Sequence, residues 1–407
     1  MSLAHRDLRA HFERPLRIAV VTETYPPEVN GVARTIAAMV RALCRRGHSI
    51  QLVRPRQETD SADDAGHDGV ETVLRPGMRL PRYPDLRIGL PAGRALLRMW
   101  RARRPDVVQI VTEGPLGASA IATAVRLGIP VISEFHTNFH AYSPHYGFGF
   151  LSSAVARYLR RLHSRADVTL VPTAEMRATL EAAGFRRLKV VGRGVESGSF
   201  GPQHRSEALR RTWGAAPGDL VALYVGRVAP EKNLALFEQA VDAMRAVASS
   251  TRVVVVGDGP AATTLRARHA DYHFAGVRHG AELAAHYASA DVFFFPSLTE
   301  TFGKVTTEAL ASGLAVVAFD YAAARQYITH GESGLLARMN DAERFVELVC
   351  EISADSHLRA KVRAGALRVA ALSWDRVVDD LETVFQEAIG RARGARIVTG
   401  RGVLESA

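Results

Sequence analysis

The residues best suited to chemistry lie in one stretch, Pro296–Gly313 (PSLTETFGKVTTEALASG). Glu300 precedes Gly303, a helix is expected from Lys304, and Glu308 lies in the early turns of that helix. The N–H groups of a first helical turn attract anions, and a glycine lets a ligand approach the backbone closely. Carboxylates accept hydrogen bonds from hydroxyl groups. The stretch therefore predicts a phosphate flanked by hydroxyl-rich groups, as in a nucleotide sugar; the alternative is a solvated helix N-terminus with favourable acidic residues.

A second candidate site is Val225–Asn233 (VGRVAPEKN), which places Arg227 and Lys232 on either side of a turn at Pro230. Two cations that converge on a diphosphate would offset the charge that develops on a leaving group. The alternative is a pair of solvated surface cations. Lysine is rare in this chain, which makes Lys232 more informative: the 52 basic residues include only Lys189, Lys232, Lys304 and Lys361.

Two further candidates lie in the first half of the chain. The loop Thr22–Arg34 (TETYPPEVNGVAR) brings Gly31 to the start of an expected helix, where a phosphate could approach. Glu134–Tyr142 (EFHTNFHAY) follows an apolar segment, so His136 is expected at the edge of a ligand site. For a single histidine, the commoner alternative is a hydrogen-bonded position in the core.

Short apolar segments alternate with amphipathic stretches, which predicts α/β structure with parallel strands and helices on both faces. The expected strands of the first half are Arg17–Thr22, His48–Arg54, Asp106–Val111, Pro130–Glu134 and Asp167–Val171, with a helix at Thr35–Arg46. The pattern restarts with strands at Leu220–Val225, Thr251–Val256, His273–Gly276, Asp291–Phe295 and Ala315–Phe319, and a last helix is expected at Trp374–Arg393. Because Arg193–Gly218 has the composition of a linker, two doubly wound domains are predicted, with ligands at the carboxyl ends of the strands in a cleft between them.

The net charge of +10 and the pI of about 10.0 suggest a nucleic-acid-binding protein at first. The excess is uneven, however, since residues 1–200 carry a net +11 and residues 201–407 a net −1. Two distant cysteines, Cys44 and Cys350, support neither a disulfide framework nor a cysteine metal site. No uncharged apolar run is long enough to span a bilayer, so a cytoplasmic protein is expected.

One helical stretch, Phe150–Asp167 (FLSSAVARYLRRLHSRAD), combines apolar residues with a high density of arginine. An apolar face is expected at Phe150, Leu151, Ala154, Tyr158 and Leu162. This composition is typical of a helix that lies on an anionic membrane surface. The alternative is an ordinary amphipathic helix packed on its own sheet.

Taken together, these motifs resemble glycosyltransferase family 4, retaining enzymes of the GT-B fold, from about Arg17 to Ile389. Glu300 and Glu308 match the E-x7-E signature of the family, and Arg227 with Lys232 match its donor-phosphate cation pair. Gly31 and His136 match the N-terminal glycine loop and the histidine on the acceptor side. The resemblance implies an acceptor-side domain at 1–198, a donor domain at 199–372 and a helix at 373–395 that crosses back to the first domain.

The resemblance also implies a role for each matched residue. His136, Glu300, Arg227 and Lys232 are the expected catalytic residues: the two cations would hold the diphosphate, and His136 would contact the sugar near its reacting carbon. Expected donor-binding residues are Gly31, Val277 near the base, Phe302, Gly303, Lys304 and Val305 at the sugar and phosphate, and Glu308 at the ribose. No Asp-x-Asp motif appears where a donor metal would be needed, so no metal and no cofactor besides the nucleotide-sugar substrate is expected.

Within the family, three stretches look similar to bacterial α-mannosyltransferases that use GDP-mannose and act on lipid acceptors. They are Thr112–Gly117 (TEGPLG), Phe135–Gly147 (FHTNFHAYSPHYG) and Asp320–Tyr327 (DYAAARQY). Sulfolipid synthases, which use a UDP-sugar, look alike over similar segments. Many relatives have two glycines in the N-terminal loop, whereas Asn30 precedes Gly31 here.

The sequence thus predicts transfer of a hexose, mannose in the first place, with retained configuration onto a lipid or glycolipid. No residue is placed by motif to be a covalent nucleophile, so the leaving phosphate is expected to take the proton of the acceptor. The alternatives are a UDP-sugar-dependent transferase, a nucleotide-sugar epimerase, a sugar-nucleotide sensor and a nucleic-acid-binding protein. The basic first half is expected to dock on an anionic membrane at the inner face of the plasma membrane, and no nucleic-acid partner is expected.

Overall fold

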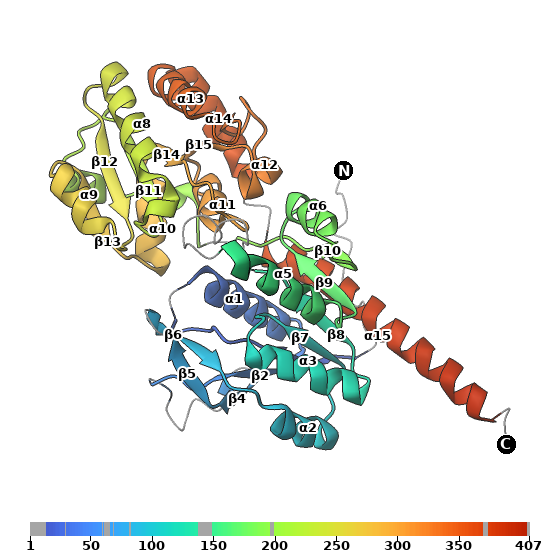
Figure 1. Ribbon diagram of the computed structural model, residues 1–407. Coiled ribbons are helices and arrows are strands. Elements are labelled where there is room, and N and C mark those ends of the chain that lie inside the picture. The colour runs from blue at the N-terminus through green and yellow to red at the C-terminus, as the bar shows by residue number, and fades with distance from the viewer. Residues whose placement is uncertain are drawn as a thin grey trace, which may run out of the picture. The chain divides into compact units, whose positions relative to one another are not determined.

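The computed structural model describes residues 14–28, 30–58, 60, 66–67, 69–80, 83–136, 149–195, 199–368 and 373–404. These residues form two compact units. The first contains residues 14–136, 149–192 and 375–404, and the second contains 193–374. Each unit is an α/β structure with its own parallel sheet, which confirms the predicted fold class (Figure 1).

The first unit is built on an eight-stranded sheet in the order β10-β9-β8-β7-β1-β2-β4-β3, in which only the β3–β4 pair is antiparallel. Its strands are β1 (Arg17–Val21), β2 (Ser49–Pro55), β3 (Gly66–His67), β4 (Val70–Arg75), β7 (Val107–Ile110), β8 (Val131–Glu134), β9 (Val168–Val171) and β10 (Leu188–Val190). A separate antiparallel ribbon is formed by β5 (Gly77–Leu80) and β6 (Tyr83–Gly89). The helices are α1 (Gly31–Arg45), α2 (Gly93–Ala102), α3 (Pro115–Leu127), α5 (Gly149–His163), α6 (Ala174–Ala182) and α15 (Trp374–Leu404).

Local sequence explains where α1 begins. The side chain of Asn30 accepts a hydrogen bond from the Ala33 N–H at 2.8 Å, so the helix starts at Gly31 rather than at the predicted Thr35. The sheet is covered by an apolar cluster that includes Ile110, Leu116 and Leu162. Trp100 of α2 is fully buried in this cluster, and its indole N–H donates to Gln51 Oε1 at 2.9 Å.

The second unit is built on a six-stranded parallel sheet in the order β13-β12-β11-β14-β15-β16. Its strands are β11 (Val221–Val225), β12 (Arg252–Val256), β13 (His273–Gly276), β14 (Val292–Phe295), β15 (Ala315–Phe319) and β16 (Leu335–Ala337). Its helices are α7 (Glu207–Thr212), α8 (Leu234–Val247), α9 (Ala262–Arg268), α10 (Gly280–Ser289), α11 (Lys304–Ala311), α12 (Ala322–Tyr327), α13 (Ala342–Ala354) and α14 (Ser356–Ala366), with 3₁₀ turns η1 (Pro202–His204) and η2 (Pro230–Lys232).

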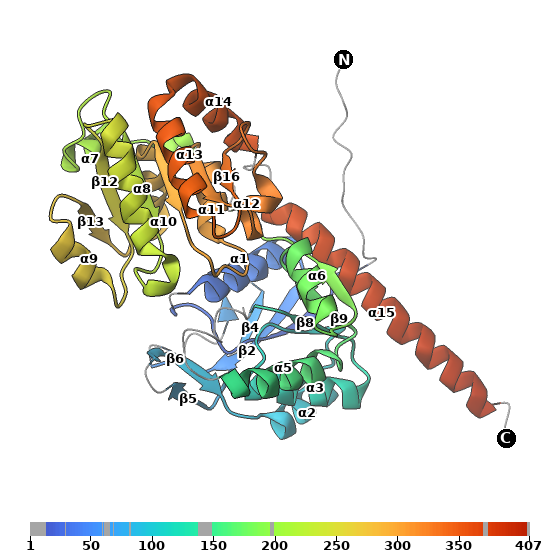
Figure 2. The ribbon, with the colours of Figure 1, turned by 45° about the horizontal axis from the view of Figure 1, so that its top comes forward.

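Successive side chains of β11 point to opposite faces of the sheet, and both faces are packed, which explains why the strand is a continuous apolar run. Tyr224 belongs to the core on one face, with Phe237 of α8 and Phe345 of α13, and those two helices lie side by side (Figure 2). Leu223 belongs to the core on the other face, with Tyr287 of α10. Because both faces of a parallel sheet are covered, every residue of the strand is buried.

The C-terminal helix α15 extends to Leu404, eleven residues beyond the predicted end, and from Asp375 onward it belongs to the first unit. Its Glu382 is buried and contacts Arg46 and His48 in the turn between α1 and β2. The Leu16 N–H donates to His48 Nδ1 at 3.0 Å, so His48 Nε2 carries the hydrogen and donates to Glu382 Oε1 at 2.9 Å. Arg46 forms an ion pair with the same carboxylate at 3.3 Å, and Lys189 of β10 pairs with Glu387 at 2.6 Å.

Replacing Glu382 with alanine is expected to destabilise the first unit by about 3 kcal/mol, because a buried pair loses one partner. The measurement is urea unfolding, together with the rate at which protease cuts α15. Asp380→Ala is the matched control, since Asp380 is an exposed acid on the same helix. Equal unfolding midpoints for the two variants would contradict this role for Glu382.

No helix within the described ranges is long and apolar enough to cross a membrane.

Candidate functional site

The candidate site of the second unit lies at the carboxyl ends of β11 and β14, two adjacent strands in the middle of the sheet. The chain proceeds from β11 outward through β12 to β13, and then returns to β14 on the other side. Strand order therefore reverses between β11 and β14. Such a reversal leaves a crevice at the carboxyl ends of the strands, where α/β proteins bind their ligands.

Lys232 and Glu300 meet above this reversal. Lys232 ends the η2 turn after β11, Glu300 lies in the loop after β14, and the two form a close ion pair. Their side chains are 15% and 16% exposed, so both reach solvent but are largely enclosed. Lys232 Nζ also lies 5.9 Å from the centre of the Phe295 ring, where a cation is favoured.

Hydrogen bonds fix the loop that carries Glu300. Ser297 Oγ donates to Glu300 Oε1 at 2.8 Å, and the backbone N–H of Glu300 donates to the hydroxyl of Tyr321 at 3.0 Å. The Tyr321 hydroxyl in turn donates to the Ser297 carbonyl at 2.8 Å. Since Tyr321 follows β15, residues after three neighbouring strands position this carboxylate.

Arg227 does not share the partner of Lys232. Its guanidinium forms an ion pair with Glu231, four residues along the chain, and its side chain is half exposed. The sequence predicted that the two cations would converge, whereas in this structure each pairs with its own carboxylate. Both lie in the segment that follows β11, so a ligand that displaces the two carboxylates would face both cations.

Gly303 precedes α11 with φ of +85°, in the left-handed region that favours glycine. No side chain of the described residues caps this helix, and the N–H groups at the start of a helix, here those of Lys304 and Val305, have no partner within the helix itself. Phe302 is buried, with its ring edge-on to Tyr327 at 6.0 Å. The predicted phosphate site is thus an existing helix N-terminus next to Glu300.

Glu308, the expected contact to the ribose, is buried and already has partners within the protein. It is 4% exposed, the Tyr287 hydroxyl donates to its Oε2 at 3.1 Å, and Lys304 Nζ lies 3.5 Å from its Oε1. Val277, the expected contact to the base, is 49% exposed just after β13. The structure therefore brings Lys232, Glu300 and Gly303 together, whereas Glu308 is held by Tyr287 and Lys304 and Val277 is exposed after β13.

Sequence reasoning missed a glycine crossing beside this site. Gly257 follows β12 with φ of +135°, and a Cβ built on it would lie 1.9 Å from the carbonyl oxygen of Gly226, which follows β11. Backbone hydrogen bonds from Val228 N to Asp258 O and from Ala261 N to Val228 O join the same two loops. The signal was present as Gly-Asp-Gly-Pro directly after an expected strand. Tyr287 and Tyr321 carry no comparable signal.

Gly31 and His136 belong to the first unit. Apart from its chain neighbours and the backbone of its own helix, no atom of the described residues lies within 4 Å of a Cβ built on Gly31, so packing does not require a glycine there. Asn30 explains the departure from a double glycine, because it caps α1 and its Nδ2 also donates to Thr24 Oγ1 at 2.6 Å. His136 is largely buried: its side chain is 12% exposed, and its Nε2 lies 3.0 Å from Oε2 of the fully buried Glu134, an arrangement that fits both a ligand-site residue and a hydrogen-bonded core histidine.

Glu23 is a further residue of the first unit that sequence reasoning did not single out. It lies between the carboxyl ends of β1 and β7, where strand order again reverses, and accepts a hydrogen bond from the Leu116 N–H at 3.0 Å. Burial raises the pKa of this carboxyl to about 7, more than the backbone hydrogen bonds lower it, and the nearby Glu113 raises it further. Glu23 is therefore about half protonated at neutral pH.

This shift makes a prediction for stability against pH. The folded-state pKa of Glu23 lies above its ordinary value of 4.5, so its contribution is complete below pH 4.5 and is lost as pH rises through 7. We expect the free energy of unfolding of the wild type to fall by about 2 kcal/mol relative to Glu23→Gln over that range, after discounting for solvent screening. Urea unfolding across the range measures the difference.

Glu343→Gln, which removes an exposed acid, serves as the control for Glu23→Gln. Its difference from the wild type should not change with pH. If the Glu23→Gln difference is equally flat, Glu23 does not titrate near neutral pH.

Comparison with known proteins identifies the family. Residues 29–198 match the profile of Glycosyltransferase Family 4, and residues 219–355 match that of Glycosyl transferases group 1. The chain is 35% identical over 383 residues to the GDP-mannose-dependent alpha-mannosyltransferase of Mycobacterium tuberculosis, a match that covers 92% of this chain and 98% of that protein. It is 30% identical over 340 residues to the sulfoquinovosyl transferase SQD2 of Arabidopsis thaliana, which covers 81% of this chain and 65% of SQD2.

The solved structure of sucrose-phosphate synthase from Thermosynechococcus elongatus matches the fold with a TM-score of 0.74 at 17% identity, over 92% of this chain and all of that one. Profile, relatives and fold agree with the motifs described above. The chain therefore belongs to glycosyltransferase family 4 and is a glycosyltransferase of the GT-B fold.

Proposed function

We propose that the enzyme transfers mannose from GDP-mannose to a lipid or glycolipid acceptor, with retention of the anomeric configuration. The observation that carries this proposal is identity of 30–35% to three GDP-mannose-dependent alpha-mannosyltransferases, each aligned over 92% of this chain. Relatives named alpha-monoglucosyldiacylglycerol synthase support a lipid acceptor.

The ion pair of Lys232 with Glu300 explains how one site can bind both the diphosphate and the sugar of the donor. A diphosphate carries more charge than a carboxylate, so it takes Glu300's place at the Lys232 ammonium. Arg227 likewise exchanges Glu231 for a phosphate oxygen. Glu300, released from Lys232 but still held by Ser297 and Tyr321, accepts hydrogen bonds from sugar hydroxyls.

The proposed chemistry places no protein nucleophile at the reacting carbon. The bond from the sugar to the diphosphate breaks as the acceptor hydroxyl approaches the same face, and the acceptor proton passes to the leaving phosphate oxygen. Lys232, Arg227 and the first-turn N–H groups of α11 stabilise the negative charge that develops on that oxygen. His136, oriented by Glu134, contacts the sugar near its reacting carbon, and Glu308 binds the ribose.

Membrane association is part of the same proposal, because a lipid acceptor is presented at a membrane surface. Helix α5 supports it only in part. Leu162, expected on the free apolar face, is buried in the core of the unit together with Leu159, whereas Tyr158 and Val155 are 46% and 41% exposed. The helix thus packs on its sheet and still presents apolar and cationic groups outward.

A panel of GDP-, UDP- and ADP-sugars tests the donor. A ligand at one hundred times its dissociation constant stabilises the folded state by about 2.7 kcal/mol, so thermal unfolding should single out GDP-mannose. Transfer from that donor to a membrane lipid extract, with the anomeric configuration of the product assigned by NMR, tests the reaction. Preference for a UDP-sugar would favour the sulfoquinovosyl-like alternative, and conversion of the donor without acceptor would favour an epimerase.

A further inference from the structure

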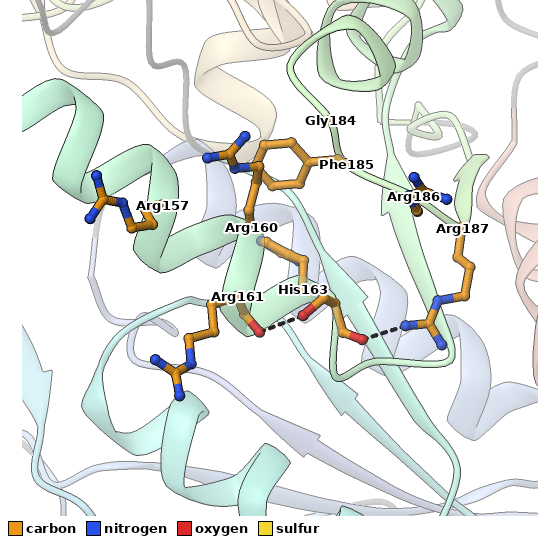
Figure 3. A pocket seen from close by; sticks show the side chains of 9 residues that line it. Arg157, Arg160, Arg161, His163, Gly184, Phe185, Arg186 and Arg187 are labelled. Carbon is orange, nitrogen blue, oxygen red and sulfur yellow. Dashed lines mark hydrogen bonds between the residues drawn. The ribbon is translucent and has the colours of Figure 1, made fainter.

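Five arginines surround one cavity in the first unit, away from the strand ends described above. Three come from the last turns of α5 and two from the turn between α6 and β10 (Figure 3). The cavity has a volume of about 560 Å³. This arginine pocket consists of Arg157, Arg160, Arg161, Arg186 and Arg187.

Among the described residues, none that lines the arginine pocket is acidic, although Glu113 lies 3.6 Å from the lining His163. Arg160 donates to the Ala183 carbonyl at 3.3 Å, and Arg187 donates to the Ser164 carbonyl. The guanidinium groups of the other three arginines form no hydrogen bond or ion pair with the described residues. By contrast, the nearby Arg177 pairs with Glu181 at 2.8 Å on α6. Five like charges around one cavity repel each other, and an anion that enters it relieves that repulsion.

The turn that supplies two of the arginines is conformationally costly. Gly184 has φ of +85°, which glycine adopts readily, but Arg187 has φ of +57°, and the left-handed region is unfavourable for a residue with a side chain. The fold holds Arg187 in this conformation next to the end of α5. Backbone strain of this kind concentrates at functional positions.

The base of the arginine pocket is rigid and partly apolar. Phe185 is 7% exposed, and its ring lies 5.7 Å from that of Phe135 and 5.9 Å from that of His163. His163 is fixed in turn by Ser133 Oγ, 2.9 Å from its Nδ1. The arginine pocket is therefore supported by the core of the unit. This support fixes the pocket in advance for a ligand with an anionic head group.

We propose that the arginine pocket binds the phosphate group of an anionic phospholipid. Guanidinium groups form paired hydrogen bonds with phosphate oxygens, and several of them can share one diester. The exposed side chains of Tyr158 and Val155 favour a lipid over a soluble phosphate. They lie three residues apart on α5, and Tyr158 is three residues from Arg161, so an apolar surface adjoins the cations. The choice of a lipid as the ligand rests on the proposed function, in which the acceptor is a lipid or glycolipid.

The test removes the three guanidinium groups that have no partner among the residues that the structure describes. The variant Arg157→Gln/Arg161→Gln/Arg186→Gln is compared with Arg94→Gln/Arg98→Gln/Arg101→Gln, which removes three exposed arginines of α2 in the same unit. The readout is co-sedimentation of the full chain with vesicles of phosphatidylcholine mixed with phosphatidylglycerol. An arginine at an anionic surface contributes about fivefold to binding, so the pocket variant should lose on the order of 100-fold and the α2 variant only about threefold.

Equal losses in both variants would overturn the proposal, because general surface charge would then explain the binding. Calorimetric titration of the wild type and the pocket variant with pyrophosphate and with single-stranded RNA completes the test: tight binding of either that is lost in the pocket variant, without vesicle binding, would also overturn the proposal. Circular dichroism melts check folding, and the single charge reversal Arg186→Glu should abolish vesicle binding if the triple variant is unstable.

These measurements involve neither donor nor sugar transfer, so the two proposals can fail separately. Vesicle binding through the arginine pocket without mannose transfer would leave the pocket intact and contradict the proposed function. Mannose transfer by the wild type, with vesicle binding unchanged in the pocket variant, would contradict the pocket alone.

Discussion

Replacing Lys232 with alanine is expected to reduce the rate of sugar transfer by about 10²–10³-fold while the protein remains folded. The reason is that Lys232 is the enclosed cation at the reversal of strand order, 15% exposed and paired with Glu300. Loss of one charge-stabilising donor at a reacting centre costs about 3 kcal/mol in the barrier. Water could take over the stabilising effect of an exposed cation. It would have to reorient around the leaving phosphate to take over that of Lys232, which is already fixed in place.

The comparison that isolates this effect uses Lys361→Ala. Lys361 is an exposed lysine of α14, so its removal changes the net charge equally. Steady-state kinetics should show a lower kcat for Lys232→Ala and wild-type values for Lys361→Ala, with similar unfolding midpoints. Wild-type kinetics in Lys232→Ala would contradict the proposed role of Lys232 in stabilising the leaving phosphate.

Glu300→Gln distinguishes the role of Glu300 from that of its partner Lys232. The amide oxygen can still accept from Ser297, so the loop after β14 should keep its structure. Lys232 would then lack its resident carboxylate and be more open to phosphate. A variant that binds the donor at least as tightly but transfers sugar slowly would show that Glu300 acts on the sugar rather than on the fold.

The strands that position this site were predictable because each is a short run of consecutive apolar residues. The expected strand Ala315–Phe319 coincides with β15, and Leu220–Val225 differs from β11 by one residue. Parallel strands with both faces covered cannot alternate in polarity, so the run itself is the signal. The start of α11 was equally clear, since the helix expected from Lys304 does begin there, directly after Gly303.

Pairings between distant segments were not predictable, because they depend on how the elements pack. Nothing in the spacing of Arg227 and Lys232 indicates that one pairs with Glu231 and the other with Glu300. The burial of Glu308 beneath Tyr287 needs α10 and α11 to be adjacent. The composition of α5 suggested a cationic surface, but the arginine pocket also needs the turn before β10, whose position relative to α5 only the fold determines.

The second large effect is expected at the glycine crossing. Gly257→Ala should destabilise the second unit by at least about 4 kcal/mol, because two costs add. The backbone φ of +135° is unfavourable for any residue with a Cβ, and that Cβ would lie 1.9 Å from the carbonyl oxygen of Gly226. Neither atom can move alone, since both loops are held by backbone hydrogen bonds.

Gly218→Ala separates these two costs. Gly218 has φ of +93°, but apart from its chain neighbours no atom in the described part of the chain lies within 4 Å of a Cβ built on it, so only the conformational cost of about 1 kcal/mol applies. Urea unfolding of both variants measures the difference, and titration with the nucleotide-sugar donor measures the consequence for binding. Alanine at 257 has to push apart the loops after β11 and β12, and the first of these leads into Lys232. Donor affinity should therefore fall in Gly257→Ala and stay unchanged in Gly218→Ala; equal stability of the two variants would show that the crossing can open without cost.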